Sequence, residues 1–201
     1  MPDEHTLVQM LVDEFGTEHF DDLRAELPDA PGAWWFRTRR PEDIQFYVIH
    51  HSGNGTTPRT YTSTIYNYHR QRFRGYGYHF TLYCYRSTPD RFWWKVRYTR
   101  SVFQWGANVK GKNDRVVGCV WVGNYATDPP DAETVEMVTG VFERLFLVLD
   151  RWLGTRPIVV GHRDLLQQGY TICPGDWAYG PNGPLMRLNA RGLPSASGND
   201  S

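Results

Sequence analysis

Three residues of types that commonly bind metal stand where apolar runs of the chain end. His50 closes the run 46–50, His162 follows the run 158–160, and Cys173 lies in a Pro-Gly loop a little further on. Two imidazoles and a thiolate suit zinc, and three protein ligands leave a fourth position open for water. Such a site activates water and polarises carbonyl groups, which is hydrolytic chemistry. On spacing alone, the pattern favours a pair of buried, hydrogen-bonded histidines and an inert cysteine, because His50 is more than a hundred residues from His162.

The segments around these residues add specific motifs. In chain order they are Phe46–Ser52, Gly75–Phe80, Gly106–Asn113, Gly118–Gly123, and the closing pair Gly161–Asp164 and Thr171–Asp176. Together they resemble the motifs of the zinc-dependent N-acetylmuramoyl-L-alanine amidases, the family of short phage endolysins and animal peptidoglycan recognition proteins. The resemblance covers roughly residues 44–180 and keeps the family's order.

The resemblance implies roles for particular residues. It makes His50, His162 and Cys173 the ligands of a Zn²⁺ cofactor, and Tyr78 the catalytic tyrosine. A phenol beside the metal can donate a hydrogen bond to the oxyanion that forms when water attacks an amide. Thr171 stands where some phage members carry lysine, and its hydroxyl can hydrogen-bond the intermediate but adds no charge. No carboxylate stands out as a general base.

Two further residues are candidates for substrate binding. His51 follows the ligand position and is expected to line the groove, although an ordinary packing role fits it as well. Asn108 stands where the phage pattern often has histidine, and asparagine cannot shuttle protons near pH 7. A groove-lining role and a structural turn role are both open for Asn108. His69, on an expected helix, is interpreted as a packing residue.

The resemblance implies a function as well as a site. The expected reaction is zinc-dependent hydrolysis of the amide between N-acetylmuramic acid and L-alanine in bacterial peptidoglycan, carried out by a phage-type endolysin that lyses the host wall. One alternative is a non-catalytic peptidoglycan-binding module, which typically lacks the cysteine ligand. Another is a cytoplasmic amidase of cell-wall recycling. The presence of all three ligands favours an enzyme over a binding module.

Hydrophobic periodicity indicates the elements that must position these residues. Helical spacing is expected within 7–27, broken near Gly16, and over 61–73, 131–152 and about 185–188. Strands are expected over 46–50, 80–85, 92–98, 116–122 and 158–160, with 80–98 forming a hairpin. The pattern predicts an α/β fold with a central mixed β-sheet flanked by helices. We expect one amidase-type domain over 41–192, an N-terminal extension over 1–40 packed on it, and a disordered tail over 193–201.

Composition limits the partners. The 22 basic residues balance 22 acidic ones, which argues against a nucleic-acid binder that works by overall charge. No apolar run is long enough to span a membrane. The first residues are acidic and lack the parts of a signal peptide. We therefore expect synthesis in the cytoplasm, action on the cell wall after membrane permeabilisation, and a monomer. Cys84 and Cys119 lie in apolar runs and are expected to be buried.

Overall fold

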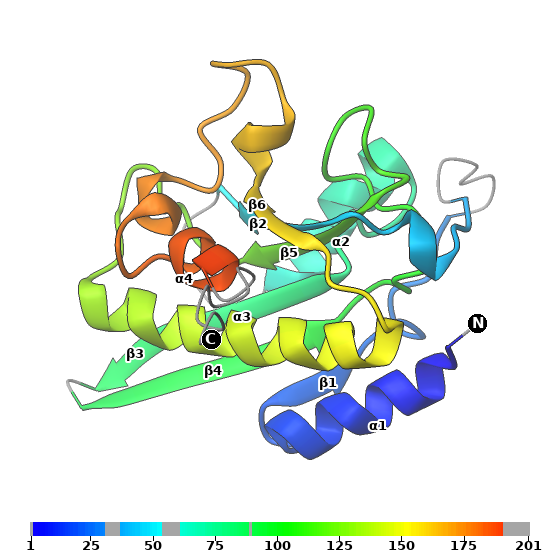
Figure 1. The fold of residues 1–201 in the computed structure, drawn as a ribbon, viewed down its shortest axis with the longest axis horizontal. Coiled ribbons are helices and arrows are strands. Elements are labelled where there is room, and N and C mark those ends of the chain that lie inside the picture. Colours follow the sequence, from blue (N-terminus) through cyan, green and yellow to red (C-terminus); the bar gives the residue numbers. More distant parts are fainter. Residues whose placement is uncertain (1, 31–36, 54–60, 89, 191–201) are drawn as a thin grey trace, which may run out of the picture.

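A computed structural model describes residues 2–30, 37–53, 61–88 and 90–190. Figure 1 shows the helices and strands along the chain. The helices are α1 (Glu4–Phe15), α2 (Tyr61–Phe73), α3 (Ala132–Leu153) and α4 (Pro184–Ala190). The strands are β1 (Phe20–Asp22), β2 (Phe46–His51), β3 (Phe80–Thr88), β4 (Arg91–Tyr98), β5 (Val116–Trp121) and β6 (Ile158–Gly161). All the expected strands are present, as are the helices expected over 61–73, 131–152 and 185–188, and α1 covers the first part of the helical range 7–27. The helical spacing expected after Gly16 is wrong, because Phe20–Asp22 instead form β1, which pairs with β4.

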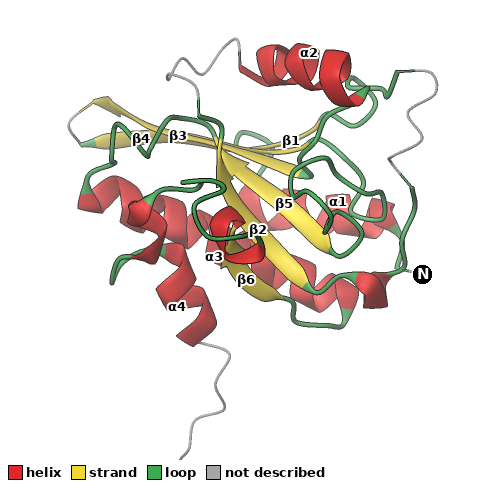
Figure 2. Ribbon diagram, turned by 90° about the horizontal axis from the view of Figure 1, so that it is seen from above, coloured by secondary structure: helices red, strands yellow, loops and turns green. Residues whose placement is uncertain are grey.

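The six strands form one mixed sheet in the order β1-β4-β3-β5-β2-β6. The β3–β4 hairpin is antiparallel, and all other neighbours in the sheet are parallel. Helix α2 lies on one side of the sheet, whereas α1, α3 and α4 lie on the other (Figure 2). The structure thus confirms the predicted α/β fold with helices flanking a mixed sheet.

Helix α3 has clear start and stop signals. The side chain of Asp131 accepts a hydrogen bond from the Thr134 N–H at 2.7 Å, and Gly154 ends the helix in the left-handed conformation with φ 69°. One face of α3 is buried against the sheet, including Leu145 and Leu149 at 1% and 0% exposure. Burying each such side chain contributes about 1.5–3 kcal/mol. The buried face of α3 therefore holds the helix firmly against its side of the sheet.

Strand β2 runs through the middle of the core and presents different side chains to its two faces. Tyr47 and Ile49 belong to the main hydrophobic cluster shared with α3, whereas Val48 packs with Val116 in a smaller cluster. Because side chains alternate along a strand, His50 shares the face of Val48. The parallel neighbours β5 and β6 end at the same edge of the sheet as β2. Side chains at these strand ends can therefore converge.

The N-terminal segment packs closely on the rest of the molecule. Helix α1 lies beside α3 (Figure 1), and β1 extends the sheet by pairing with β4. The indole of Trp152 donates a hydrogen bond to the Asp3 carbonyl at 2.9 Å. The predicted domain limits at residues 41 and 192 stay predictions, and the tail 193–201 lies outside the described residues.

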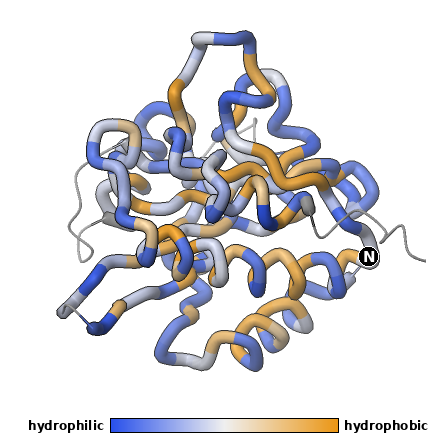
Figure 3. The backbone as a smooth tube through the Cα atoms, turned by 60° about the vertical axis from the view of Figure 1, so that its left-hand side comes forward, coloured by the Kyte–Doolittle hydropathy of each residue, from blue (hydrophilic) through white to orange (hydrophobic). Residues whose placement is uncertain are grey.

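Hydrophobic residues concentrate along the inner strands and the packed faces of the helices (Figure 3). Cys84 and Cys119 are both buried, as expected, with 5% and 0% of their surface exposed. No helix in the described part of the chain is both long and apolar enough to cross a membrane.

Candidate active site

The three expected metal ligands converge at the carboxyl edge of the sheet. His50 lies near the end of β2, His162 directly follows β6, and Cys173 lies in the loop beyond. Their ligand atoms all lie within 4.8 Å of one another, and Cys173 Sγ is 3.7 Å from His50 Nδ1. Ligands of a tetrahedral zinc ion, with bonds of about 2.0–2.3 Å, stand about 3.3–3.8 Å apart. The cluster therefore fits zinc in donor type, and the distance between Cys173 Sγ and His50 Nδ1 lies within this range.

The protonation states of the two histidines suit metal binding. Burial lowers the pKa of His50 well below its usual value, and the nearby His162 lowers it further. Burial likewise lowers the pKa of His162 to about 4. Both imidazoles are therefore neutral near pH 7, and each has a nitrogen lone pair available for a metal.

The cysteine behaves differently, because burial raises the pKa of Cys173 to about 12. The main-chain N–H of His51 opposes this effect by donating to the sulfur at 3.3 Å. Without a metal Cys173 is a neutral thiol, and a bound cation would displace its proton. Cys173 thus has the properties of a metal ligand that becomes a thiolate only when the ion binds.

Only the first of the two adjacent histidines joins the cluster. His51 is the next residue of β2, so its side chain points to the opposite face from His50. The imidazole of His51 is buried, with 8% of the residue exposed. The main chain of His51 contacts the sulfur of Cys173, and the imidazole of His51 contributes to lowering the pKa of His162. A groove-lining role for its side chain stays a prediction.

Tyr78 lies beside the cluster, just before β3. Its ring centroid is 5.0 Å from that of His50. Burial raises the pKa of Tyr78, so the residue remains a phenol and keeps a proton to donate. The Tyr78 carbonyl accepts from Thr99 Oγ1 at 3.1 Å, and the preceding Gly77 N–H donates to His69 Nδ1 at 3.0 Å. His69 thus packs and supports this segment, as the sequence indicated.

Thr171 belongs to the loop that carries Cys173. Its hydroxyl oxygen accepts a hydrogen bond from the Cys173 N–H at 3.2 Å. Because an alcohol can accept and donate at once, the Thr171 proton stays available for another partner. The residue is only partly buried. Thr171 can therefore shape the cysteine loop and also donate to a bound group.

Asn108 is turned into the protein. Only 9% of the residue is exposed, and its Nδ2 donates to the Gly77 carbonyl at 2.8 Å. The side chain of Asn113 accepts from the N–H groups of Asn108 and Val109, both at 3.0 Å. Burial and these bonds favour the structural alternative over a groove-lining role.

One residue that sequence reasoning did not single out supports the same region. Arg100 is 4% exposed, its Nε donates to the Tyr76 carbonyl, and its guanidinium forms an ion pair with Asp29. The sequence near Arg100 carries no motif that would reveal this role, since its partners lie far away in the chain.

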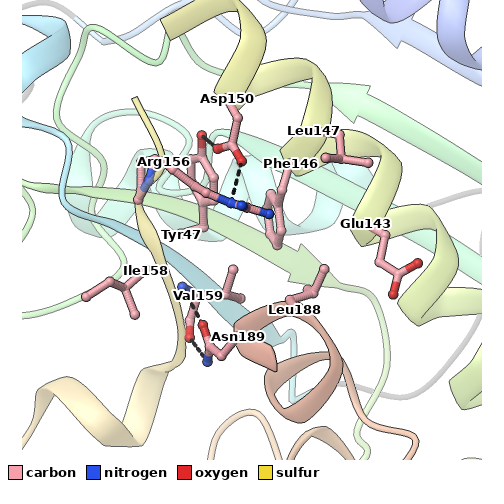
Figure 4. Close-up of a pocket in the computed structure, with 11 residues that line it drawn as sticks. Tyr47, Glu143, Phe146, Leu147, Asp150, Arg156, Ile158, Val159, Leu188 and Asn189 are labelled. Carbon is pink, nitrogen blue, oxygen red and sulfur yellow. Dashed lines mark hydrogen bonds and ion pairs between the residues drawn. The ribbon is translucent and has the colours of Figure 1, made fainter. Parts of the chain in front are cut away.

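A separate cavity of about 350 Å³ lies between α3, β6 and α4, on the face of β2 opposite to His50 (Figure 4). Tyr47 donates to Asp150 at 2.9 Å, and Arg156 lies 3.6 Å from the same carboxylate. Asn189 makes two hydrogen bonds to the main chain of Val159 in β6, at 3.3 and 2.8 Å. None of the converging metal-ligand residues lines this cavity.

The fold and the cluster define an α/β domain with a candidate metal centre of hydrolase type. The sequence model of the N-acetylmuramoyl-L-alanine amidases matches residues 40–176, which is more than half of the chain. The chain belongs to this family.

Solved structures share the fold at low sequence identity. The endolysin N-acetylmuramoyl-L-alanine amidase LysCS from Clostridium intestinale is 19% identical, with a TM-score of 0.52 over 78% of this chain and 89% of its own. The Ph2119 endolysin from a Thermus scotoductus bacteriophage is 17% identical, with a TM-score of 0.52 over 78% and 92%. The Drosophila peptidoglycan recognition protein SD is 22% identical, with a TM-score of 0.56 over 82% and 97%. No curated protein sequence matches the chain.

Proposed function

We propose that the protein is a zinc-dependent amidase that hydrolyses the bond between N-acetylmuramic acid and L-alanine in bacterial peptidoglycan. The observation that carries this proposal is the convergence of His50, His162 and Cys173 on one point, with the phenol of Tyr78 beside them. Membership of the amidase family supports the choice of bond.

Each residue of the site has a separate role in the proposed reaction. When bound, a zinc ion supplies a Lewis acid and lowers the pKa of its water. His50, His162 and Cys173 would hold the ion. The phenol of Tyr78 donates a hydrogen bond to the amide oxygen as negative charge develops on it. Thr171 supplies a second, uncharged donor from the cysteine loop.

A peptidoglycan-binding module without activity is the main rival, and the structural relatives include a recognition protein. The complete set of three ligands favours the enzyme, because binding alone does not require a metal centre next to a protonated tyrosine.

We further propose that the protein acts as a monomeric endolysin that reaches the host wall once the membrane is permeabilised. Its likeness in fold to two endolysins supports this setting.

The decisive experiment is mass spectrometry of purified peptidoglycan after digestion, with and without a chelator. Free stem peptides that begin with L-alanine, released only without the chelator, are the expected products. Intact glycan–peptide units in both samples, together with binding to peptidoglycan, would support the binding module instead.

A cysteine substitution tests the metal ligands. Cys173→Ser should remove bound zinc and activity together, because a serine hydroxyl is a far weaker zinc ligand than a thiolate. Cys84→Ala is the matched control, since Cys84 is a buried cysteine of β3 outside the cluster. Metal content by mass spectrometry and peptide release are the readouts. Full activity in Cys173→Ser would refute the ligand assignment.

A further inference from the structure

Hydrogen bonding determines which way the side-chain amide of Asn108 is oriented. Its nitrogen faces the Gly77 carbonyl at 2.8 Å, and a carbonyl oxygen can only accept. The amide oxygen, Oδ1, must therefore point the other way. There it is buried and lacks a hydrogen-bond partner of good geometry. Leaving such an acceptor unsatisfied costs about 1–3 kcal/mol, so its surroundings need an explanation.

The complementary group is on His50. Its Nε2 is also buried without a hydrogen-bond partner of good geometry, while its Nδ1 faces the sulfur of Cys173. Burial lowers the pKa of His50 most and His162 lowers it further, but the Asn108 side chain acts in the opposite direction. An acceptor facing an imidazole N–H has this effect. The Asn108 amide lies against Gly118, the register partner of Val48, and therefore on the same face of the sheet as the His50 imidazole.

Two glycines make room for this amide. A Cβ atom at Gly106 would lie 2.2 Å from Asn108 Nδ2, and one at Gly118 would lie 2.5 Å from Asn108 Cγ. Real Cβ atoms do not approach other atoms so closely. The Asn113 side chain meanwhile fixes the main chain at Asn108. The amide therefore occupies a narrow space beside Gly106 and Gly118 that allows it little rotation.

We propose that Asn108 is a positioning residue that orients His50 for metal binding. Asn108 Oδ1 accepts a hydrogen bond from His50 Nε2–H, which places the lone pair on Nδ1 toward His162 and Cys173. Partners behind a metal-binding histidine fix its tautomer and ring orientation in this way. Through Gly77, the same amide connects the metal ligand to the segment that carries Tyr78. This inference rests on the proposed zinc site.

The first test compares zinc dissociation constants by competition with a chelator. Asn108→Leu removes the acceptor and should weaken zinc binding by about 10–100-fold. Asn108→Asp keeps an oxygen that accepts from His50 Nε2–H, and should bind zinc more tightly than Asn108→Leu. The control is Asn113→Ala, which loosens the same loop without touching His50 and should bind zinc with close to wild-type affinity. Wild-type affinity in Asn108→Leu, or equal losses in all three variants, would overturn the proposal.

The second test does not depend on whether a variant folds. Nitrogen-15 NMR of the metal-free wild-type protein, labelled on histidine, should show His50 with its proton on Nε2. A His50 protonated on Nδ1 would contradict the proposal directly. The two proposals can also fail separately. A wild-type protein that binds zinc and shows the Nε2–H tautomer but releases no stem peptides would refute the amidase function and leave the role of Asn108 intact.

Discussion

Tyr78 combines two properties that are useful in a hydrolase. Its ring packs between His50 and His69, with centroid distances of 5.0 and 5.2 Å, so the aromatic part contributes to packing. Its hydroxyl group remains protonated because burial raises its pKa. The ring and the hydroxyl can therefore be tested independently.

Tyr78→Phe keeps the ring and removes the donor. We expect the rate of peptidoglycan cleavage to fall by about 10²–10³-fold, as when one oxyanion donor is removed. The zinc dissociation constant and the melting temperature should stay close to wild type, because the phenyl ring preserves the contacts with both histidines. Peptide release, metal competition and calorimetry measure these three quantities. An unchanged cleavage rate would show that Tyr78 has a packing role only.

At the scale of elements, the segment before β3 is held by several main-chain contacts. Arg100 donates to the Tyr76 carbonyl, Asn108 to that of Gly77, and Thr99 to that of Tyr78. Arg100 is in turn paired with Asp29 of the N-terminal segment. The N-terminal segment therefore supports the segment of the candidate catalytic tyrosine, even though it lies outside the family motifs.

Asp29→Asn tests this connection. Removing the charge leaves the buried Arg100 guanidinium with a weaker partner, so the free energy of unfolding should fall by about 1–3 kcal/mol. Denaturant unfolding followed by fluorescence measures this change. Glu42→Gln is the control, because the ion pair of Glu42 with Arg40 is exposed on both sides and such pairs contribute at most about 1 kcal/mol. Equal effects of the two substitutions would contradict a supporting role for Asp29.

Elements with a strong local pattern could be predicted, and those that depend on distant contacts could not. The buried stripe of α3 and its cap at Asp131 are visible in the sequence, and α2 spans the range that its spacing indicates. Strand β1 has three residues within a range whose spacing indicated a helix, and it exists because it pairs with β4. The metal cluster was predicted from motifs, whereas the burial of Asn108 follows from its contacts with Gly77 and Gly118, which the local sequence does not reveal.

At the scale of the whole molecule, burial lowers the pKa of five histidines in the described part of the chain, which are His50, His51, His69, His79 and His162. Burial lowers the pKa of His69 to about 4, as it does for His162, and it lowers those of His50 and His79 well below the usual value. In the unfolded chain each histidine titrates near its ordinary pKa of about 6.5. At a pH between the lowered pKa values of the folded state and about 6.5, the unfolded state therefore binds more protons than the folded state does.

The metal-free protein should therefore lose stability in acid. The contribution of these histidines is fully present above pH of about 6.5 and is lost as the pH falls toward 4, by about 2 kcal/mol for His69 alone between pH 7 and 5. Urea unfolding at pH 7, 6 and 5 measures the slope. His69→Gln, which retains an acceptor for the Gly77 N–H, should give a shallower dependence. A free energy of unfolding that is the same at pH 5 and pH 7 would disagree with this account.

Both edges of the sheet, β1 on one side and β6 on the other, are protected against pairing with a further strand. At one border, β1 is only three residues long, and Asp21 within it pairs with Lys95. At the other, the amide of Asn189 occupies both the N–H and the carbonyl of Val159 in β6. Unpaired main-chain groups at a sheet edge act as a template on which another chain can add a strand and begin to aggregate. A short charged strand on one side and a side-chain amide on the other leave little of that template open.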